Sequence, residues 1–81
     1  MDTTATELKK QTEKWLKKLE NERKAVATKR KAPGLDVAME NLDAYISDTH
    51  HFMKEGDWVR AFEAVIYAWG ILETLRWLEM A

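Results

Sequence analysis

The sequence contains no cysteine, which excludes disulfide bonds and metal sites built from thiolates. It also lacks a long apolar run. The longest nearly apolar stretch, residues 61–72, has about twelve residues and contains Glu63, whereas a membrane-spanning helix needs about 20. The N-terminal residues have neither the basic nor the apolar region of a signal peptide. We therefore expect a cytoplasmic protein with no membrane partner.

Motifs that carry chemistry are missing as well. The sequence has no glycine-rich phosphate loop, no His-Glu-x-x-His pair and no nucleophile elbow. The adjacent His50 and His51 would point about 100° apart on a regular helix, so they could not hold one ion together. We expect both at the edge of an apolar face or in solvent. The sequence therefore predicts no catalytic, cofactor-binding or metal-binding residues, and no enzymatic activity.

Two breaks divide the chain into three helical segments. A chain of 81 residues is expected to form one domain, spanning residues 1–81. Pro33 disfavours helical geometry in the residue before it, and Gly56 takes the left-handed conformation that ends helices. We predict an all-α protein, an antiparallel up-down-up three-helix bundle, with helices at residues 5–31, 36–54 and 58–79.

Polar residues mark the expected starts of these helices. Thr4 and Glu7 have the spacing of a capping box, in which the hydroxyl and the carboxylate each satisfy a free backbone amide. Asp36 and Asp57 are expected to cap the second and third helices, because a carboxylate accepts hydrogen bonds from the first turn. Each helix therefore has a start signal within a few residues of its predicted boundary.

The third helix is apolar over a much wider arc than the other two. The first two helices repeat apolar residues at three- and four-residue steps, which gives each a single apolar face. Around Phe62, an arc of roughly 240° on the third helix holds apolar residues. They are Trp58, Val59, Ala61, Ala64, Val65, Ile66, Ala68, Trp69, Ile71, Leu72 and Leu75. We therefore place this helix in the groove between the others, with Trp15, Trp58 and Trp69 in the core.

Charge is distributed unevenly along the chain. Residues 1–32 hold ten Lys/Arg and five Asp/Glu, whereas residues 33–81 hold three Lys/Arg and nine Asp/Glu. A basic segment can bind phosphates, and a basic helix can equally pack beside two acidic helices whose fields offset it. An accessory nucleic-acid-binding domain is therefore the alternative function. Its contacts would come from Lys9, Lys10, Lys14, Lys17, Lys18, Lys24, Lys29, Arg30 and Lys31.

The C-terminal end combines apolar side chains with the expected thinning of the bundle. Trp77, Leu78 and Met80 lie where few neighbours remain, and an exposed apolar patch commonly marks a partner surface. Glu73 and Arg76, three residues apart, are expected to form a surface pair. The favoured function is a non-catalytic helical protein-interaction module, acting as a homodimer or with a larger protein partner.

The last third of the chain resembles a known family, the archaeal domain-of-unknown-function family 357. The family's pattern is a Phe-x-x-x-Gly-Asp-aromatic turn, then Ala-Phe-x-Ala, then Tyr-Ala-Trp-Gly. It is matched here by Phe52, Gly56-Asp57-Trp58, Ala61-Phe62-Glu63-Ala64 and Tyr67-Ala68-Trp69-Gly70. Trp58 stands where tyrosine is frequent. The resemblance implies a short helical bundle, an archaeal source and a cytoplasmic setting, and it implies no known reaction.

Overall fold

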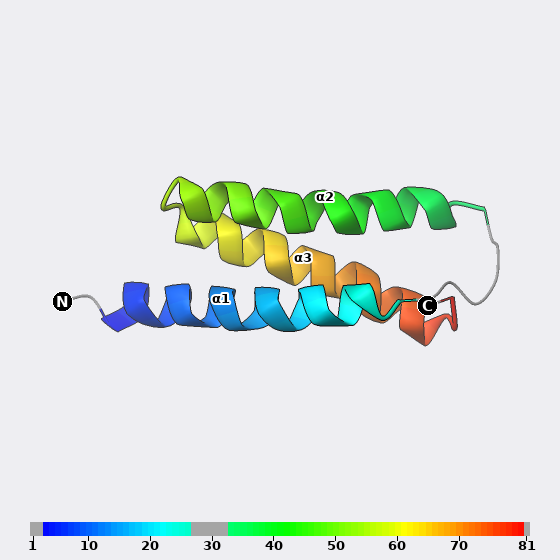
Figure 1. Cartoon of the computed structure of the whole chain (residues 1–81), viewed down its shortest axis with the longest axis horizontal. Coiled ribbons are helices and arrows are strands. Elements are labelled where there is room, and N and C mark those ends of the chain that lie inside the picture. The colour runs from blue at the N-terminus through cyan, green and yellow to red at the C-terminus, as the bar shows by residue number, and fades with distance from the viewer. Residues whose placement is uncertain (1–2, 27–32, 81) are drawn as a thin grey trace.

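A computed structural model describes residues 3–26 and 33–80 of the chain. These residues form three α-helices: α1 (Thr3–Lys24), α2 (Leu35–Lys54) and α3 (Trp58–Trp77). α1 and α3 run in the same direction and α2 runs antiparallel to both (Figure 1). The bundle is a rod with principal extents of 49 × 17 × 16 Å. The predicted all-α, up-down-up bundle is therefore confirmed.

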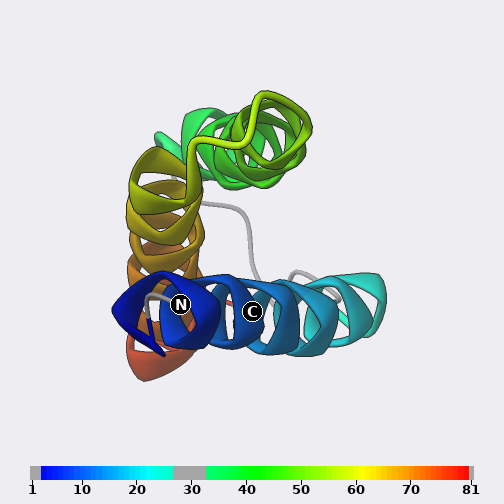
Figure 2. The same cartoon turned by 90° about the vertical axis from the view of Figure 1, so that its left-hand side faces the viewer.

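α3 lies between α1 and α2, which scarcely contact one another (Figure 2). Small residues on α3 are buried against the two neighbours, which allows both helices to approach its axis closely. The central core consists of Leu16, Leu19, Leu42, Val65, Ala68, Trp69 and Leu72. α1 and α2 are instead bridged by polar contacts, Arg23 with Asp43 and Glu20 with His50. The predicted position of the third helix, in the groove between the others, is confirmed.

α1 is shorter at its C-terminal end than expected. It ends at Lys24, and the amides of Ala25 and Val26 bind the carbonyls of Glu22 and Arg23 three residues back. After Val26 the sequence offers no large apolar side chain before Leu35 that could hold a further turn against α3. The rest of the expected helix, residues 27–31, lies outside the described residues.

The predicted capping box at the first helix is wrong. α1 already includes Thr3, so Thr4 lies inside the first turn rather than before it. The carboxylate of Glu7 accepts a hydrogen bond of 2.8 Å from Nε2 of Gln11, one turn further along the helix. The side chain expected to reach back toward Thr4 is therefore engaged in the opposite direction.

Gly34, not Asp36, is the cap of α2. Its φ of 83° is left-handed, and its carbonyl accepts the first helical bond from Ala38. The helix starts earlier than predicted because Leu35 is buried and belongs to the first turn. Asp36 lies within that turn, where a carboxylate is favoured by the positive end of the helix dipole.

The turn between α2 and α3 agrees with the sequence prediction. Gly56 has a φ of 74°, and its amide binds the carbonyl of Met53 at 3.1 Å. The amide of Asp57 binds the carbonyl of Phe52 at 2.9 Å, which completes a Schellman motif. The carboxylate of Asp57 then accepts a hydrogen bond from the amide of Arg60, at 3.1 Å, and caps α3. A single Gly-Asp pair therefore ends one helix and starts the next.

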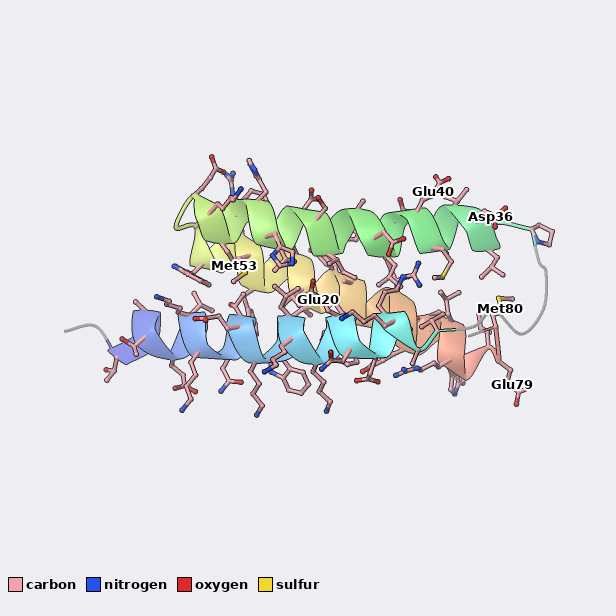
Figure 3. All side chains as sticks on the ribbon, viewed as in Figure 1. Glu20, Asp36, Glu40, Met53, Glu79 and Met80 are labelled. Atoms are coloured by element: carbon pink, nitrogen blue, oxygen red, sulfur yellow. The ribbon has the colours of Figure 1, made fainter. Side chains whose placement is uncertain are left out.

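α3 ends in the same motif with a different residue at its left-handed position. Glu79 has a φ of 60°, and its amide binds the carbonyl of Arg76. The amide of Met80 binds the carbonyl of Leu75 at 2.8 Å. Glu79 points away from the rod and Met80 turns back toward it (Figure 3).

Candidate interaction surface

The outward side of α3 carries three exposed apolar side chains, although the wide apolar arc predicted that Val59 and Ile66 would be buried. Val59 is 69% exposed, Ile66 44% and Trp77 85%. The two neighbouring helices cover the flanks of α3 and leave its outward side open. At 3.6 residues per turn, these three residues and Gly70 fall within about 40° of one another around the helix. We call Val59, Ile66, Gly70 and Trp77 the α3 stripe.

Two shallow hollows flank the α3 stripe and meet at Gly70. The hollow on the α1 side has a volume of about 310 Å³ and is lined by Trp15, Ile66, Trp69, Gly70 and Glu73. The hollow on the α2 side has a volume of about 410 Å³ and is lined by Ala38, Tyr67, Gly70, Ile71, Thr74 and Leu75. We call the edge of each hollow on the side of α1 or α2 its rim. On the α2 rim, the ring of Tyr67 packs against the ring of Tyr45, with centroids 5.6 Å apart. The middle of α3 is therefore a low point between two rims.

No contact among the described residues requires the residue at position 70 to be glycine. Gly70 lies inside α3, and a Cβ placed on it would meet nothing within 4 Å. A glycine inside a helix costs about 0.5–1 kcal/mol of stability relative to alanine. Nothing in the packing of the described residues offsets that cost.

The α1 rim is built from tryptophan rings and lysine side chains. Trp69 is 8% exposed and meets Trp15 edge to face, with centroids 5.8 Å apart. Its Nε1 donates a hydrogen bond of 3.1 Å to the carbonyl of Trp15. The ammonium groups of Lys14 and Lys18 lie 5.6 and 5.2 Å from the Trp15 ring centroid. This rim is therefore aromatic, cationic and fixed to α3.

Trp15 and Trp58 were expected in the core, and both are only half-buried. Lys14 and Lys18 contact the ring of Trp15, and the ammonium of Lys9 lies 5.4 Å from the centroid of Trp58. Trp15 packs against the core cluster, and each of the two rings lies beside at least one lysine. Only Trp69 of the three meets the prediction.

The C-terminal residues predicted as a partner surface adjoin the α3 stripe. Trp77 belongs to the stripe, Leu78 is 42% exposed, and Met80 is half-buried. Met80 follows the left-handed Glu79, a position from which an apolar side chain commonly contacts the last turn of its helix. Trp77 and Leu78 thus extend the apolar surface to the end of α3.

The charged residues near this surface are arranged differently from the prediction. Arg76 does not form the expected pair with Glu73; its Nη1 binds Oε1 of Glu22 on α1. The guanidinium of Arg76 is directed toward α1, whereas Glu73 lines the hollow beside Trp15. Glu73 is therefore an exposed acid on the α1 rim.

An ion pair on another side of the bundle joins α1 to α2. Arg23 binds Asp43 through two hydrogen bonds, of 2.7 and 3.1 Å. The hydrogen bond from Arg23, together with its charge, lowers the pKa of Asp43, and the same contact raises the pKa of Arg23. Both side chains are partly exposed, so water screens the pair. It is a structural contact across the α1–α2 boundary.

The two histidines bind different partners, and their predicted exposure is confirmed. Nε2 of His50 lies 3.0 Å from Glu20 on α1, which points toward α2 in Figure 3. Nε2 of His51 lies 3.0 Å from Glu55 on its own helix. Within residues 3–26 and 33–80, no three His, Cys, Asp or Glu side chains form a group that could hold a metal ion. The same residues contain no helix long and apolar enough to cross a membrane.

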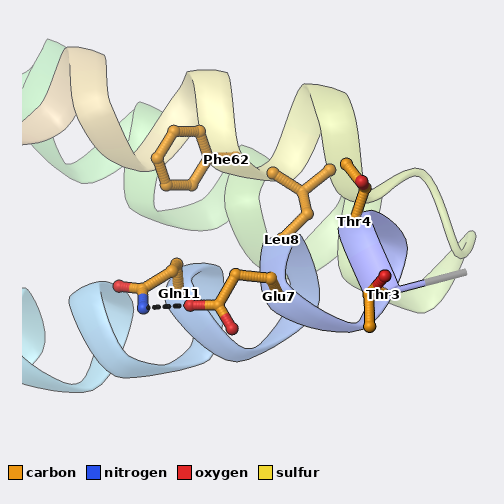
Figure 4. Close-up of a pocket in the computed structure, with 6 residues that line it drawn as sticks. All are labelled: Thr3, Thr4, Glu7, Leu8, Gln11 and Phe62. Carbon is orange, nitrogen blue, oxygen red and sulfur yellow. Dashed lines mark hydrogen bonds between the residues drawn. The ribbon is translucent and has the colours of Figure 1, made fainter.

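A further hollow lies at the other end of the rod, between the start of α1 and α3 (Figure 4). Its volume is about 420 Å³, and it is lined by Thr3, Thr4, Glu7, Leu8, Gln11 and Phe62. Leu8 and Phe62 supply its apolar wall, while Glu7 and Gln11 bind each other along α1. Most of the surface that lines this hollow is apolar.

Comparisons with known proteins place these features in a family. The model of a family described as a protein of unknown function (DUF357) matches residues 9–81. The chain is similar to protein AF1782 from Archaeoglobus fulgidus, which matches the same family and whose crystal structure is known, with 37% sequence identity. The two structures superpose with a TM-score of 0.80 over 96% of this chain and 95% of that chain. No curated protein matches the chain.

Proposed function

The chain belongs to the DUF357 family of proteins of unknown function, and we propose that it acts as a non-catalytic protein-interaction module in the cytoplasm. The family resemblance in the Gly-Asp-aromatic turn and the Tyr-Ala-Trp-Gly segment is thereby confirmed, and the solved relative is archaeal. The partner surface in this proposal comprises the α3 stripe and the adjoining C-terminal residues Leu78 and Met80.

The observation that carries this proposal is the exposure of Trp77. A tryptophan that is 85% exposed leaves a large apolar ring in water, and tryptophan is among the residues that contribute most to protein interfaces. Ile66 and Val59 continue the surface along the same side of α3. Exposed apolar side chains gathered on one side of a helix are typical of interaction sites in soluble proteins.

Affinity capture with matched variants tests this function. The immobilised chain is incubated with extract of the source organism, and retained proteins are identified by mass spectrometry. We expect a retained protein to be lost with Trp77→Ala and kept with Lys10→Ala, which removes an exposed side chain from α1. Circular dichroism establishes that both variants fold. Equal retention by the wild type and Trp77→Ala would contradict the proposal.

The second candidate function is nucleic-acid binding by α1, favoured by the contacts of its lysines with aromatic rings. Lys9, Lys14 and Lys18 lie 5.2–5.6 Å from the centroids of half-buried tryptophans. A basic helix with adjacent aromatic rings offers both phosphate contacts and stacking surfaces. Lys10, Lys17 and Lys24 are also exposed on α1, whereas Lys29, Arg30 and Lys31 lie outside the described residues.

Salt dependence distinguishes this candidate from protein binding. Phosphate contacts release counterions, so binding to RNA or DNA should be strong at roughly 50 mM salt and fall steeply by about 200 mM. The double variant Lys14→Glu/Lys18→Glu should abolish a gel shift that Lys54→Glu, on α2, leaves intact. The absence of any shift with the wild type at low salt would refute this candidate.

A further inference from the structure

We propose that the α3 stripe binds a second copy of this chain, with α3 of the two copies packed antiparallel across a twofold axis. This inference rests on the proposed function and names its partner. A twofold interface requires a surface that is complementary to itself. The order of residues along the α3 stripe has this property.

The stripe follows the seven-residue pattern of a helix–helix seam. Val59, Ile66 and Glu73 are spaced by seven residues, and so are Glu63, Gly70 and Trp77. The second set takes the a positions of a coiled coil and the first set takes the d positions, and each set contains one glutamate among residues that are usually apolar. In an antiparallel pair each a position faces a d position of the partner. Val59 of one copy therefore faces Trp77 of the other, and Ile66 faces Gly70. The twofold axis makes each of these contacts occur twice.

The sizes of these residues favour the antiparallel arrangement. Ile66 is a branched side chain that is 44% exposed, and it would fit above Gly70 of the other copy, where the two hollows meet. A parallel pair would instead place Gly70 against Gly70 and Trp77 against Trp77. The first contact would leave a gap, and the second would force two bulky rings together. Only the antiparallel register pairs each large residue with a small one at the centre.

The charges beside the stripe do not distinguish the two directions, because the antiparallel register brings Glu63 of one copy level with Glu73 of the other. Glu63 and Glu73 are exposed and lie about 80° apart around α3, with Glu73 toward α1 and Glu63 toward α2. Rotation about an axis perpendicular to α3 keeps α1 beside α1, so Glu63 and Glu73 of different copies lie on opposite sides of the seam. In a parallel pair the two copies of Glu63 would likewise lie at one level on opposite sides of the seam. Lys14 and Lys18 lie beside Trp15, which lines the same hollow as Glu73, so this edge of each copy carries a net positive charge.

The antiparallel dimer explains why position 70 is a glycine. Among residues 3–26 and 33–80 of a single copy, nothing lies within 4 Å of the position that its Cβ would take. A small residue at a helix crossing lets a second backbone come close, and this advantage exists only when another helix is present. The stability that α3 loses by containing a glycine is then recovered in the dimer.

Cysteine cross-linking tests both the partner and the direction of packing, because the chain has no cysteine of its own. Val59→Cys and Trp77→Cys are made as separate variants at exposed positions and mixed under mild oxidation. We expect a disulfide-linked dimer in the mixture and little in either variant alone. Positions 59 and 77 are about 27 Å apart along a helix, so an antiparallel pair cannot join position 59 to itself. Ser47→Cys, exposed on α2, measures random collision.

Sedimentation equilibrium tests association without cross-linking. We expect a dimer for the wild type at about 100 µM, a concentration that populates a complex with a Kd of about 10 µM. Ile66→Glu should weaken dimerisation at least about tenfold, which is about 1.4 kcal/mol. Val37→Glu introduces the same charge at a 57% exposed position on α2 and should leave the dimer unchanged.

The outcomes separate failure of this inference from failure of the proposed function. A monomeric wild type that still captures another protein through Trp77 refutes the homodimer and leaves the interaction function standing. A monomer without such capture refutes both. Efficient cross-linking of Val59→Cys with itself overturns the antiparallel register, and a dimer unaffected by Ile66→Glu overturns the choice of surface.

Discussion

At the scale of single residues, two left-handed positions end helices in the same way with different side chains. Gly56 has a φ of 74° after α2, and Glu79 has a φ of 60° after α3. Glycine adopts this conformation freely, whereas other residues are disfavoured there by roughly 1–2 kcal/mol. The end of α3 is therefore held in a conformation that its sequence opposes.

Glu79→Gly should stabilise the protein by about 1 kcal/mol, because it removes the steric conflict at the left-handed position. Urea unfolding followed by circular dichroism measures the change. Glu40→Gly, at an exposed position inside α2, should instead destabilise the protein by about 0.5–1 kcal/mol. If Glu79→Gly lowered the free energy of unfolding, the side chain of Glu79 would contribute more stability than its left-handed backbone conformation costs.

The contact between Arg23 and Asp43 should make stability depend on pH in the acid range. The lowered pKa of Asp43 means that its contribution is present above its unfolded pKa of about 3.9. That contribution is lost as the pH falls through the folded pKa. Asp43→Asn should cost less than about 1 kcal/mol at pH 7, because the pair is exposed, and almost nothing near pH 2.

Urea unfolding at a series of pH values measures this difference, with Asp48→Asn, at another exposed position of α2, as the control. The control should change stability little at any pH. A difference between Asp43→Asn and the wild type that persists unchanged at pH 2 would assign the effect to packing rather than to the ion pair.

At the scale of elements, the glycine that follows α2 and the glycine inside α3 affect stability in opposite directions. Gly56 is required by its backbone, whereas Gly70 lies in regular helix with open space around it. Gly56→Ala should destabilise the protein by about 1 kcal/mol, and Gly70→Ala should stabilise the isolated subunit by about 0.5–1 kcal/mol. Thermal unfolding at low protein concentration compares the two. Equal effects of the same sign would contradict this assignment.

Helix boundaries could be predicted where local chemistry determines them. Gly56 and Asp57 place the second break correctly because each acts through its own backbone or carboxylate. The predicted end of α1 lies too far along the chain, because Lys29, Arg30 and Lys31 resemble a favourable helix terminus although the sequence between Val26 and Leu35 holds no large apolar residue. Local signals predict a boundary well when packing does not compete with them.

At the scale of the whole molecule, α3 forms the structural centre and α1 is the more weakly attached outer helix. α2 packs against α3 along more of its length than α1 does. We therefore expect amide hydrogen exchange to be faster in α1 than in α2 or the middle of α3. Trp15→Ala removes the edge-to-face contact with Trp69 and should accelerate exchange mainly in α1. Uniform protection across the three helices would contradict this order.

The position of the candidate surface could be predicted only in part. Trp77 and Leu78 were identified because they follow the last residues able to reach the core. Val59 and Ile66 were assigned to the interior, because an apolar arc in the sequence does not reveal how much of it two neighbouring helices can cover. The sequence does contain an indication of this surface at Gly70, because a glycine lies inside a strongly apolar helix where no turn requires it.

An odd number of helices gives the rod one further property. The described chain starts at one end of a body 49 Å long and finishes at the other (Figure 1). A protein fused before Thr3 and another fused after Met80 would be held apart by this length, with α3 acting as a strut between them. Two such rods packed antiparallel through α3 would place the start of one chain near the finish of the other at each end of the pair.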